Sequence, residues 1–296
     1  MSRTTAMKTS DVSVIIPCKD EARSIGALIS GIREHLPGAA ILVMDDGSSD
    51  DSAAIARAEG ATVMSHPYSM GNGAAIKAGI RAADTSIVVC MDADGQHRPE
   101  DIPPLLEALD EGFEMAVGAR STGAQASSSR RLANTIYNRF AGWMVGHKVP
   151  DLTSGMRAFK RSKALDFLHL LPNGFSYPTT LTMAFFRAGY AVRYVPIRLE
   201  PRVGKSHISP FRDGVRFLLI IFKVGTLYSP LKVFFPLSAL LFATGLGYYL
   251  FTYWTQNRFT NMGALLFLTS VIVFLMGLLS EQVTSLLYQS KPDRQG

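Results

Sequence analysis

Two long stretches without a charged side chain, both near the C-terminus, constrain the fold of this chain more than any other feature. The 25 residues between Lys232 and Arg258 carry no charge, and neither do the 22 residues from Phe259 to Ser280. A helix needs roughly 20 apolar residues to cross a bilayer, and soluble helices rarely lack a polar face over such a length. The sequence therefore predicts two transmembrane helices, and the alternative is a soluble hydrophobic hairpin.

The cations around these stretches predict their orientation. The connecting loop holds Arg258 alone, whereas the flanks hold six cations: Arg212, Arg216, Lys223, Lys232, Lys291 and Arg294. Cations accumulate on the cytoplasmic side of membrane proteins, so both flanks and the preceding residues are expected in the cytoplasm, at the inner membrane. The polar segment Met1–Asp11 does not resemble a signal peptide, which agrees with this expectation.

The first 200 residues alternate between apolar runs typical of buried strands and segments with helical spacing. Strands are expected at 12–17, 40–44, 62–65, 86–91, 114–118, 155–160 and 190–199, and helices at 21–35, 52–59, 71–83, 99–111, 130–145 and 177–188. Such alternation specifies an α/β fold with a Rossmann-like, mostly parallel sheet that helices cover on both faces. Ligands of such sheets bind at the carboxyl ends of the strands.

Changes in composition divide the chain into four parts. Residues 1–207 form the expected α/β domain, and residues 231–290 form the membrane hairpin, followed by a cytoplasmic tail at 291–296. In the connecting region, 208–230, the cations Arg212, Arg216 and Lys223 gather on one side of an apolar helix. This pattern favours a helix that lies in the headgroup layer of the membrane, and the alternative is a helix that packs against the domain.

Two acidic clusters directly follow two of the expected strands. Residues 45–50 read Asp-Asp-Gly-Ser-Ser-Asp, and residues 92–97 begin with Asp92-Ala93-Asp94 and include Gln96. Oxygen ligands of this type suit a hard cation such as Mg²⁺ or Mn²⁺, which combines a few carboxylates with phosphate oxygens. The clusters therefore predict a site for a nucleotide and its metal ion at the carboxyl edge of the sheet.

Composition narrows the classes of partner. The net charge of +6 and the pI near 9.3 suit nucleic acid, an anionic lipid surface or a phosphorylated substrate. Because the cations concentrate near the apolar stretches, lipid and phosphate are favoured and nucleic acid is not expected. The two cysteines, Cys18 and Cys90, lack the spacing of a zinc site or a disulfide framework.

A set of motifs spread over residues 12–207 identifies a family. The motifs are Ile16-Pro17 with Asp20-Glu21-Ala22, residues 45–50, Gly71-Asn72-Gly73 with Lys77, Asp92-Ala93-Asp94-Gly95-Gln96-His97, and Asp151 with Ser154-Gly155-Met156-Arg157. With them the chain resembles family 2 glycosyltransferases of the GT-A fold, in particular the dolichol- and undecaprenyl-phosphate mannosyl- or glucosyltransferases. The two C-terminal spans are typical of that lipid-phosphate branch.

The resemblance implies roles for individual residues. The nucleotide-sugar donor would be bound by Pro17, Asp20, Glu21, Asp45, Asp46, Gly73, Asp92, Ser154 and Arg157. The metal ion would be held by Asp92, Asp94 and Gln96. The phosphate of the acceptor would be bound by Arg120 and Arg131, with Arg202 and Lys205 as further cations near the membrane. Asp94, Arg120 and Arg131 are the residues expected to matter most for catalysis.

One departure from the family pattern bears on the acceptor. Relatives often carry an acidic residue after a Gly-Phe-Ser segment, but residues 174–180 (Gly-Phe-Ser-Tyr-Pro-Thr-Thr) contain none. An acceptor hydroxyl needs a general base, whereas a phosphate with a second pKa of about 6 is already ionised near neutral pH. The missing carboxylate therefore favours a polyprenyl phosphate as the acceptor.

The expected reaction is a single in-line displacement at the anomeric carbon, which inverts the configuration and gives a polyprenyl phosphosugar. The donor is expected to be of the GDP-mannose or UDP-glucose type, and a homo-oligomer is left open. Other lipid or glycan acceptors are alternatives, although the Gln-x-x-Arg-Trp motif of processive polysaccharide synthases is absent from the sequence. A further alternative is that the protein is not an enzyme but a catalytically silent membrane scaffold. The presence of Asp92 and Asp94 argues against it.

Overall fold

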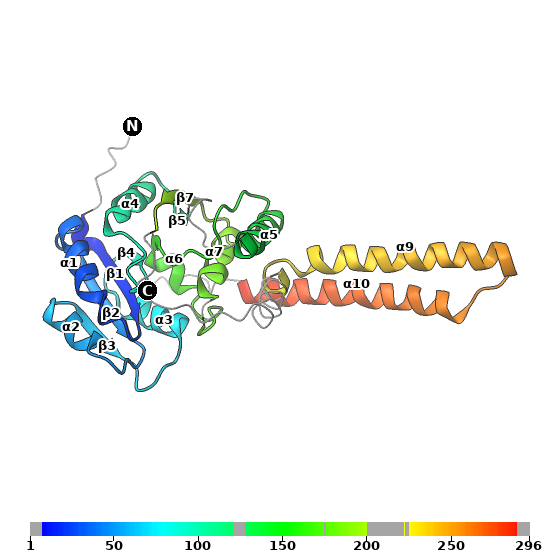
Figure 1. The fold of residues 1–296 in the computed structure, drawn as a ribbon. Coiled ribbons are helices and arrows are strands. Elements are labelled where there is room, and N and C mark those ends of the chain that lie inside the picture. Colours follow the sequence, from blue (N-terminus) through cyan, green and yellow to red (C-terminus); the bar gives the residue numbers. More distant parts are fainter. Residues whose placement is uncertain (1–7, 121–127, 175, 200–221, 223–224, 289–296) are drawn as a thin grey trace. The chain divides into compact units, whose positions relative to one another are not determined.

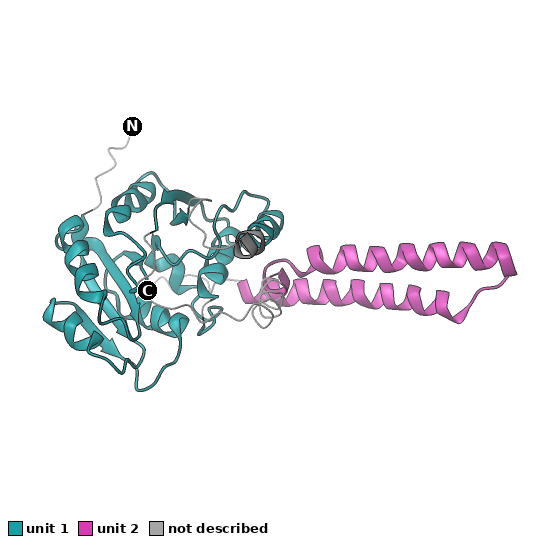
Figure 2. Cartoon of the chain, viewed as in Figure 1, with its two compact units in different colours: residues 1–209 teal, residues 210–296 magenta. Residues whose placement is uncertain are grey.

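The computed structural model describes residues 8–120, 128–174, 176–199, 222 and 225–288, without the side chains of residues 128–134. The chain divides into two compact units, Met1–Ser209 and Pro210–Gly296 (Figure 2). The first unit contains a seven-stranded sheet with helices, and the second contains two long helices. Most of the expected interfacial helix at 208–230 lies outside the described residues.

The first unit alternates strands and helices as the sequence predicts (Figure 1). Its strands are β1 (Val12–Cys18), β2 (Ala40–Asp45), β3 (Thr62–Ser65), β4 (Ile87–Cys90), β5 (Met115–Arg120), β6 (Arg157–Lys160) and β7 (Val192–Ile197). Its α-helices are α1 (Ile25–His35), α2 (Ser52–Ala58), α3 (Asn72–Ala82), α4 (Ile102–Asp110), α5 (Ser128–Val145), α6 (Arg161–Leu165) and α7 (Tyr177–Arg187). Short 3-10 helices, η1 (Thr9–Asp11) and η2 (Pro99–Asp101), precede β1 and α4.

The sheet is mostly parallel, which confirms the expected class. Its strand order is β3-β2-β1-β4-β6-β5-β7, and among these strands β6 runs against both of its neighbours. Nothing in the pattern of the sequence indicated this reversal. As a result, the beginning of β6 lies at the same edge of the sheet as the end of β4, since Cys90 is aligned with Arg157.

Alternation along the strands sends side chains to two covered faces. Val14 and Ile16 of β1 belong to a fully buried apolar cluster with Ile29 of α1 and Leu105 of α4. On the other face, Ile15 packs so closely under α3 that a side chain at Gly79 would collide with it. Both faces are therefore closed by helices, and the edges of the sheet are left for ligands.

Several expected boundaries differ from the structure by two or more residues, and one short helix was not expected. Helix α1 begins at Ile25 rather than at residue 21, because residues 22–24 form a turn in which the Ser24 amide bonds to the Glu21 carbonyl. Strand β6 begins at Arg157, two residues later than expected, and the short helix α6 that follows it was not expected. These are places where local spacing competes with turns set by contacts distant in sequence.

The second unit contains helices α9 (Pro230–Gln256) and α10 (Asn261–Tyr288), each long and apolar enough to cross a membrane. The side chains between them are small or hydroxylated and recur at intervals of seven residues. They are Ser238, Gly245 and Thr252 of α9, and Gly263, Ser270, Gly277 and Thr284 of α10. Large apolar side chains such as Leu240, Phe251 and Leu279 point outward, so the hairpin has the pattern of a lipid-embedded helix pair.

Candidate functional site

The loops that follow β1 and β2 are bonded to each other and form one wall of the carboxyl edge. Asp20, which adopts a left-handed backbone with φ of 55°, accepts a hydrogen bond of 2.7 Å from the Ser49 amide. In return, the Ala22 amide donates to Asp50 at 3.1 Å. Asp20 and its neighbour Glu21, expected at the donor site, are therefore held in place by the loop after β2.

Asp46 is bound by the protein itself rather than left open for a ligand. It is buried, and its two carboxylate oxygens accept four hydrogen bonds. The donors are His66 Nδ1 at 2.8 Å, Ser69 Oγ at 2.7 Å, the Met70 amide at 2.7 Å and the Gly71 amide at 2.9 Å. Burial alone would raise the pKa of Asp46, but these bonds lower it below its ordinary value. Asp46 thus anchors the loop 66–71 to the site.

The expected metal ligands Asp92 and Asp94 lie in the turn directly after β4. Asp94 accepts a hydrogen bond of 3.2 Å from the Gln96 amide, and the Ser24 hydroxyl donates to the Ala93 carbonyl at 2.6 Å. The Asp92 side chain is 34% exposed and lies 3.9 Å from buried His97. The turn is therefore fixed from the helix α1 side while Asp92 stays accessible.

Gly155 borders the Asp92 carboxylate because β6 is reversed. A Cβ at position 155 would lie 2.2 Å from Asp92 Oδ2, so any side chain there would displace the carboxylate. Arg157, fully buried, bonds to the Ser154 and Pro178 carbonyls, the latter at 2.7 Å. Arg157 therefore holds the loop that carries Gly155. The resemblance implied that Arg157 and Ser154 contact the nucleotide sugar, and the structure buries both side chains.

Arg120 and Asp151 form a bidentate ion pair near the acidic turn that contains Asp92 and Asp94. Arg120 Nε donates to Asp151 Oδ2 at 2.6 Å and Arg120 Nη2 donates to Oδ1 at 2.8 Å. Burial would raise the pKa of Asp151, but Arg120 lowers it. Burial would lower the pKa of Arg120, but its hydrogen bonds and ion pair with Asp151, together with the charge of Asp92, raise it. The guanidinium of Arg120 thus adds positive charge near the acidic turn.

Gly73 marks a close approach of two backbone segments. A Cβ at Gly73 would lie 2.2 Å from the Pro172 carbonyl oxygen, and Lys77 Nζ donates to the Leu171 carbonyl at 3.1 Å. The start of α3 is thereby tied to the segment that leads into α7. Only glycine fits at position 73, because the backbone of this segment passes directly over it. Gly73 therefore has a packing role next to the expected site of the nucleotide sugar.

The structure brings most of the expected site residues to one edge of the sheet. Pro17 and Asp45 lie at the ends of β1 and β2, where the Asp45 carboxylate accepts the Ser48 amide at 3.0 Å. Arg131 lies in α5, but its side chain is outside the described residues, as are Arg202 and Lys205. Among the described side chains, no group of three His, Cys, Asp or Glu residues converges to hold a metal ion by itself.

Two contributors, His66 and Ser24, were missed by the sequence analysis. His66 is 20 residues from its partner Asp46, and Ser24 is 69 residues from its partner Ala93. Neither residue belongs to a motif with recognisable spacing, so no signal in the sequence could have identified them.

Comparison with protein families gives two matches that together span most of the chain. Residues 13–167 match the model of glycosyl transferase family 2, and residues 229–286 match the GtrB C-terminal hairpin. The first match covers the sheet with its acidic edge, and the second covers α9 and α10.

Similar proteins include a dolichyl-phosphate hexose transferase of Haloferax volcanii, 31% identical over 72% of this chain and 93% of its own length. A polyprenol monophosphomannose synthase of Mycolicibacterium smegmatis is 31% identical over 69% of this chain and 83% of its own. Among solved structures, the chain is similar to glucosyl-3-phosphoglycerate synthase from Mycobacterium tuberculosis, solved with Mn²⁺, uridine diphosphate and glucosyl-3-phosphoglycerate. The TM-score is 0.60 and the sequence identity is 22%, and the superposition covers 74% of this chain and 81% of that chain. This likeness shows that the sheet unit has the GT-A fold.

Proposed function

Since the chain belongs to glycosyl transferase family 2, we propose that it transfers a hexose from a nucleotide sugar to a polyprenyl phosphate at a membrane. The observation that carries this proposal is the combination, in one chain, of the acidic edge of the sheet unit with a hairpin of the GtrB type. The names of the relatives from Haloferax volcanii and Mycolicibacterium smegmatis support a lipid-phosphate acceptor. The donor is of the GDP-mannose or UDP-glucose type.

The acidic turn fits a divalent cation, Mg²⁺ or Mn²⁺, that is shared with the donor. Asp92 and Asp94 offer two carboxylates, and the absence of a side chain at Gly155 leaves room for the Asp92 carboxylate itself. Two carboxylates are too few for a cation of this kind, so the remaining ligands would be Gln96, water and the diphosphate of the donor. When bound, such a cation neutralises the charge that develops on the departing nucleoside diphosphate.

The residues of the chain would contribute mainly position and charge. Asp20, Glu21 and the loop anchored by Asp46 would form the donor wall, and Arg120, fixed by Asp151, would place positive charge near the diphosphate. The acceptor phosphate is already ionised and needs orientation rather than deprotonation. In-line attack by its oxygen on the anomeric carbon then inverts the configuration and gives a β-linked phosphosugar.

We place the sheet unit on the cytoplasmic side of the inner membrane. This placement rests on the six cations that flank the hairpin against the one in its loop. A thiol reporter introduced in the α9–α10 loop is expected to react with an impermeant reagent added outside the cell, and a reporter at residue 296 is not. The reverse labelling would invert the placement.

Arg131 provides the test of the acceptor assignment. We expect Arg131→Ala to lower transfer to polyprenyl phosphate by about 10- to 150-fold, because a charge-assisted contact contributes roughly 1.5–3 kcal/mol. Slow hydrolysis of the donor should persist, since water needs no phosphate-binding cation. Transfer and hydrolysis are measured separately in detergent with undecaprenyl phosphate.

The neighbouring Arg130 is the matched control, because consecutive positions of a helix lie about 100° apart around its axis. Arg130→Ala should change transfer only slightly. If Arg131→Ala lowered transfer and hydrolysis equally, the residue would act on the donor or on folding. If Arg130→Ala had the larger transfer defect, the acceptor contact would belong to Arg130 instead.

A further inference from the structure

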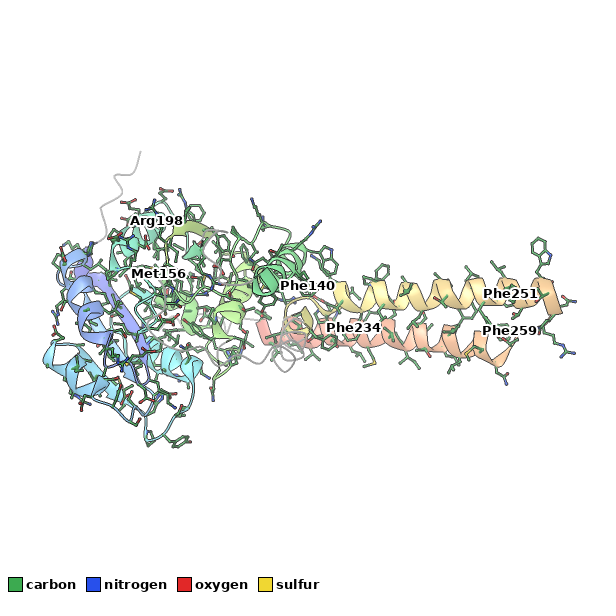
Figure 3. All side chains as sticks on the ribbon, in the orientation of Figure 1. Phe140, Met156, Arg198, Phe234, Phe251 and Phe259 are labelled. Atoms are coloured by element: carbon green, nitrogen blue, oxygen red, sulfur yellow. The ribbon has the colours of Figure 1, made fainter. Side chains whose placement is uncertain are left out.

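Helix α5 has two apolar faces, and the protein core covers only one of them. The buried face consists of Tyr137, Ala141 and Met144. On the second face, Ile136 is 54% and Trp143 is 51% exposed. Phe140 lies between them, half-buried, with its ring 5.8 Å from that of Trp143 (Figure 3 labels Phe140). Two large apolar side chains thus remain in contact with solvent on a helix that is already packed.

The exposed residues form a stripe rather than scattered points. Positions 136, 140 and 143 are four and three residues apart, which places them within about 60° around the helix. The stripe is centred about 100° away from the buried face by the same geometry. A contiguous apolar stripe of this kind on a soluble surface marks a place where something binds.

The charge around this stripe has a single sign. Residues 121–150 contain no Asp or Glu, while they contain four cations: Arg130, Arg131, Arg139 and Lys148. Arg139 and Lys148 are exposed, and Arg139 lies about 60° from the centre of the stripe. The surface is therefore apolar in the middle and positive at its side, which complements anionic lipid headgroups above an acyl layer.

We propose that this stripe, formed by Ile136, Phe140 and Trp143 with Arg139 at its side, docks on the surface of an anionic bilayer. A bilayer is favoured over another protein because the chain carries its own two candidate membrane spans and because the charged residues of the segment 121–150 are all positive. Tryptophan at such a position is typical of the membrane interface.

Docking would also fix the depth of the start of α5. The first turn of the helix, with residues 130 and 131, would be held at the level of the headgroups, where the phosphate of a lipid acceptor is found. These two positions lie about 110° and 150° around the helix from the stripe, on the side away from the acyl layer. This last step rests on the proposed function, whereas the docking itself does not.

The tryptophan content of the chain permits a direct test, because Trp143 and Trp254 are its only tryptophans. In Trp254→Phe, Trp143 is the single tryptophan of the full chain. We would reconstitute this variant into vesicles of phosphatidylglycerol and phosphatidylcholine whose acyl chains carry bromine at a shallow or a deep position. Trp143 emission should be lost with brominated lipid, more with shallow than with deep bromine, since interfacial helices insert only about 5–10 Å. Acrylamide in the aqueous phase should quench it weakly.

Two variants serve as controls. Trp143→Phe leaves Trp254, which lies in the last turn of α9 and should be quenched by brominated lipid whether or not α5 docks. Adding Arg139→Gln and Lys148→Gln to Trp254→Phe should reduce lipid quenching of Trp143 in anionic vesicles, as should raising the salt concentration. Strong quenching of Trp143 by acrylamide without quenching by brominated lipid would overturn the proposal. Protection from both quenchers would also overturn it, because the stripe would then be covered by protein.

Discussion

Between β1 and α1 the buried side chains are Val14, Ile16 and Ile29, whereas between α9 and α10 they are Gly245, Ser270 and Gly277. The sheet unit places its large apolar groups inside, and the hairpin places them outside. In water, removal of apolar surface from solvent drives packing. In lipid that gain is missing, so helices associate through close backbone contact and hydrogen bonds between small residues. Each unit therefore has the core that suits its own solvent.

Charge follows the same division. The sheet unit buries Asp46, Asp151 and Arg157, each with several hydrogen bonds to neighbouring segments. In the hairpin, the buried polar groups are hydroxyls that bond to backbone carbonyls, such as Ser270 to the Ser238 carbonyl at 3.0 Å. Groups able to bind a charged substrate are thus concentrated in the sheet unit, and the comparison predicts where substitutions affect chemistry and where they affect only assembly.

The largest expected effect is that of Asp94→Asn, which would show that chemistry depends on the sheet unit alone. Removing one carboxylate from the metal site should lower transfer at least about 1,000-fold, or about 4 kcal/mol, while the protein still inserts into membranes. Transfer assays at saturating Mg²⁺ or Mn²⁺ measure this. Glu107→Gln, an exposed change on α4, should leave transfer intact. Turnover close to wild type in Asp94→Asn would remove Asp94 from the metal site.

The same substitution in the two units sharpens the contrast in packing. Leu105 is 0% exposed in the sheet unit, and Leu279 is 68% exposed in the hairpin. Leu105→Ala should lower the free energy of unfolding of the sheet unit by about 2–5 kcal/mol, whereas Leu279→Ala should change the stability of the hairpin by less than about 0.5 kcal/mol. Hydrogen exchange of backbone amides reports both. Equal destabilisation would mean that Leu279 packs against protein in the membrane.

Gly155→Ala tests whether the reversed strand shapes the metal site. The added methyl group would meet Asp92 Oδ2 at 2.2 Å and displace the carboxylate. We expect a loss of transfer of about 100-fold with normal folding, because displacements of about 1 Å at a catalytic site have effects of this size. Gly174→Ala is the control, since its methyl group would meet nothing within 4 Å. Unchanged Mn²⁺ dependence and rate in Gly155→Ala would contradict the assignment.

The smallest effect concerns the hydroxyls of the hairpin. Ser270→Ala removes the interhelical bond to Ser238 and should weaken helix association by about 0.6 kcal/mol, a typical value for such bonds in lipid. Thr269→Ala is matched to it, because Thr269 bonds within its own helix to the Leu265 carbonyl at 2.7 Å. Resonance energy transfer between separately expressed helices can measure the difference. A larger loss in Thr269→Ala would point to an outer partner for α10.

The sequence was sufficient for features that depend on one segment alone. Helices α9 and α10 were predicted because each charge-free run exceeds the length of a span. The position of Asp92 and Asp94 was predicted because the turn directly follows the buried residues of β4. Boundaries of β2, β3 and α7 were correct within one residue for the same reason.

Features that depend on contacts between distant segments could not be predicted. The reversal of β6 is defined by its pairing with β4 and β5, and local spacing is the same for a parallel and an antiparallel buried strand. The four hydrogen bonds that Asp46 accepts come from a loop some 20 residues away, and no spacing in the sequence indicated them; its contact with the nucleotide sugar stays a prediction. The sequence does not show whether an aspartate of a motif binds a ligand or accepts hydrogen bonds from the protein itself, whereas the structure shows its hydrogen bonds.

The ion pair between Arg120 and Asp151 has a consequence for how this enzyme can evolve. Arg120 is the last residue of β5, and Asp151 lies in the segment that precedes β6. The ion pair therefore holds together the two ends of the 30-residue segment 121–150. Residues on the exposed side of this segment can change in sequence without shifting β4 and β6, whose ends border Asp92 and Gly155. The acidic edge of the sheet can therefore keep its shape while the exposed part of this segment changes in sequence.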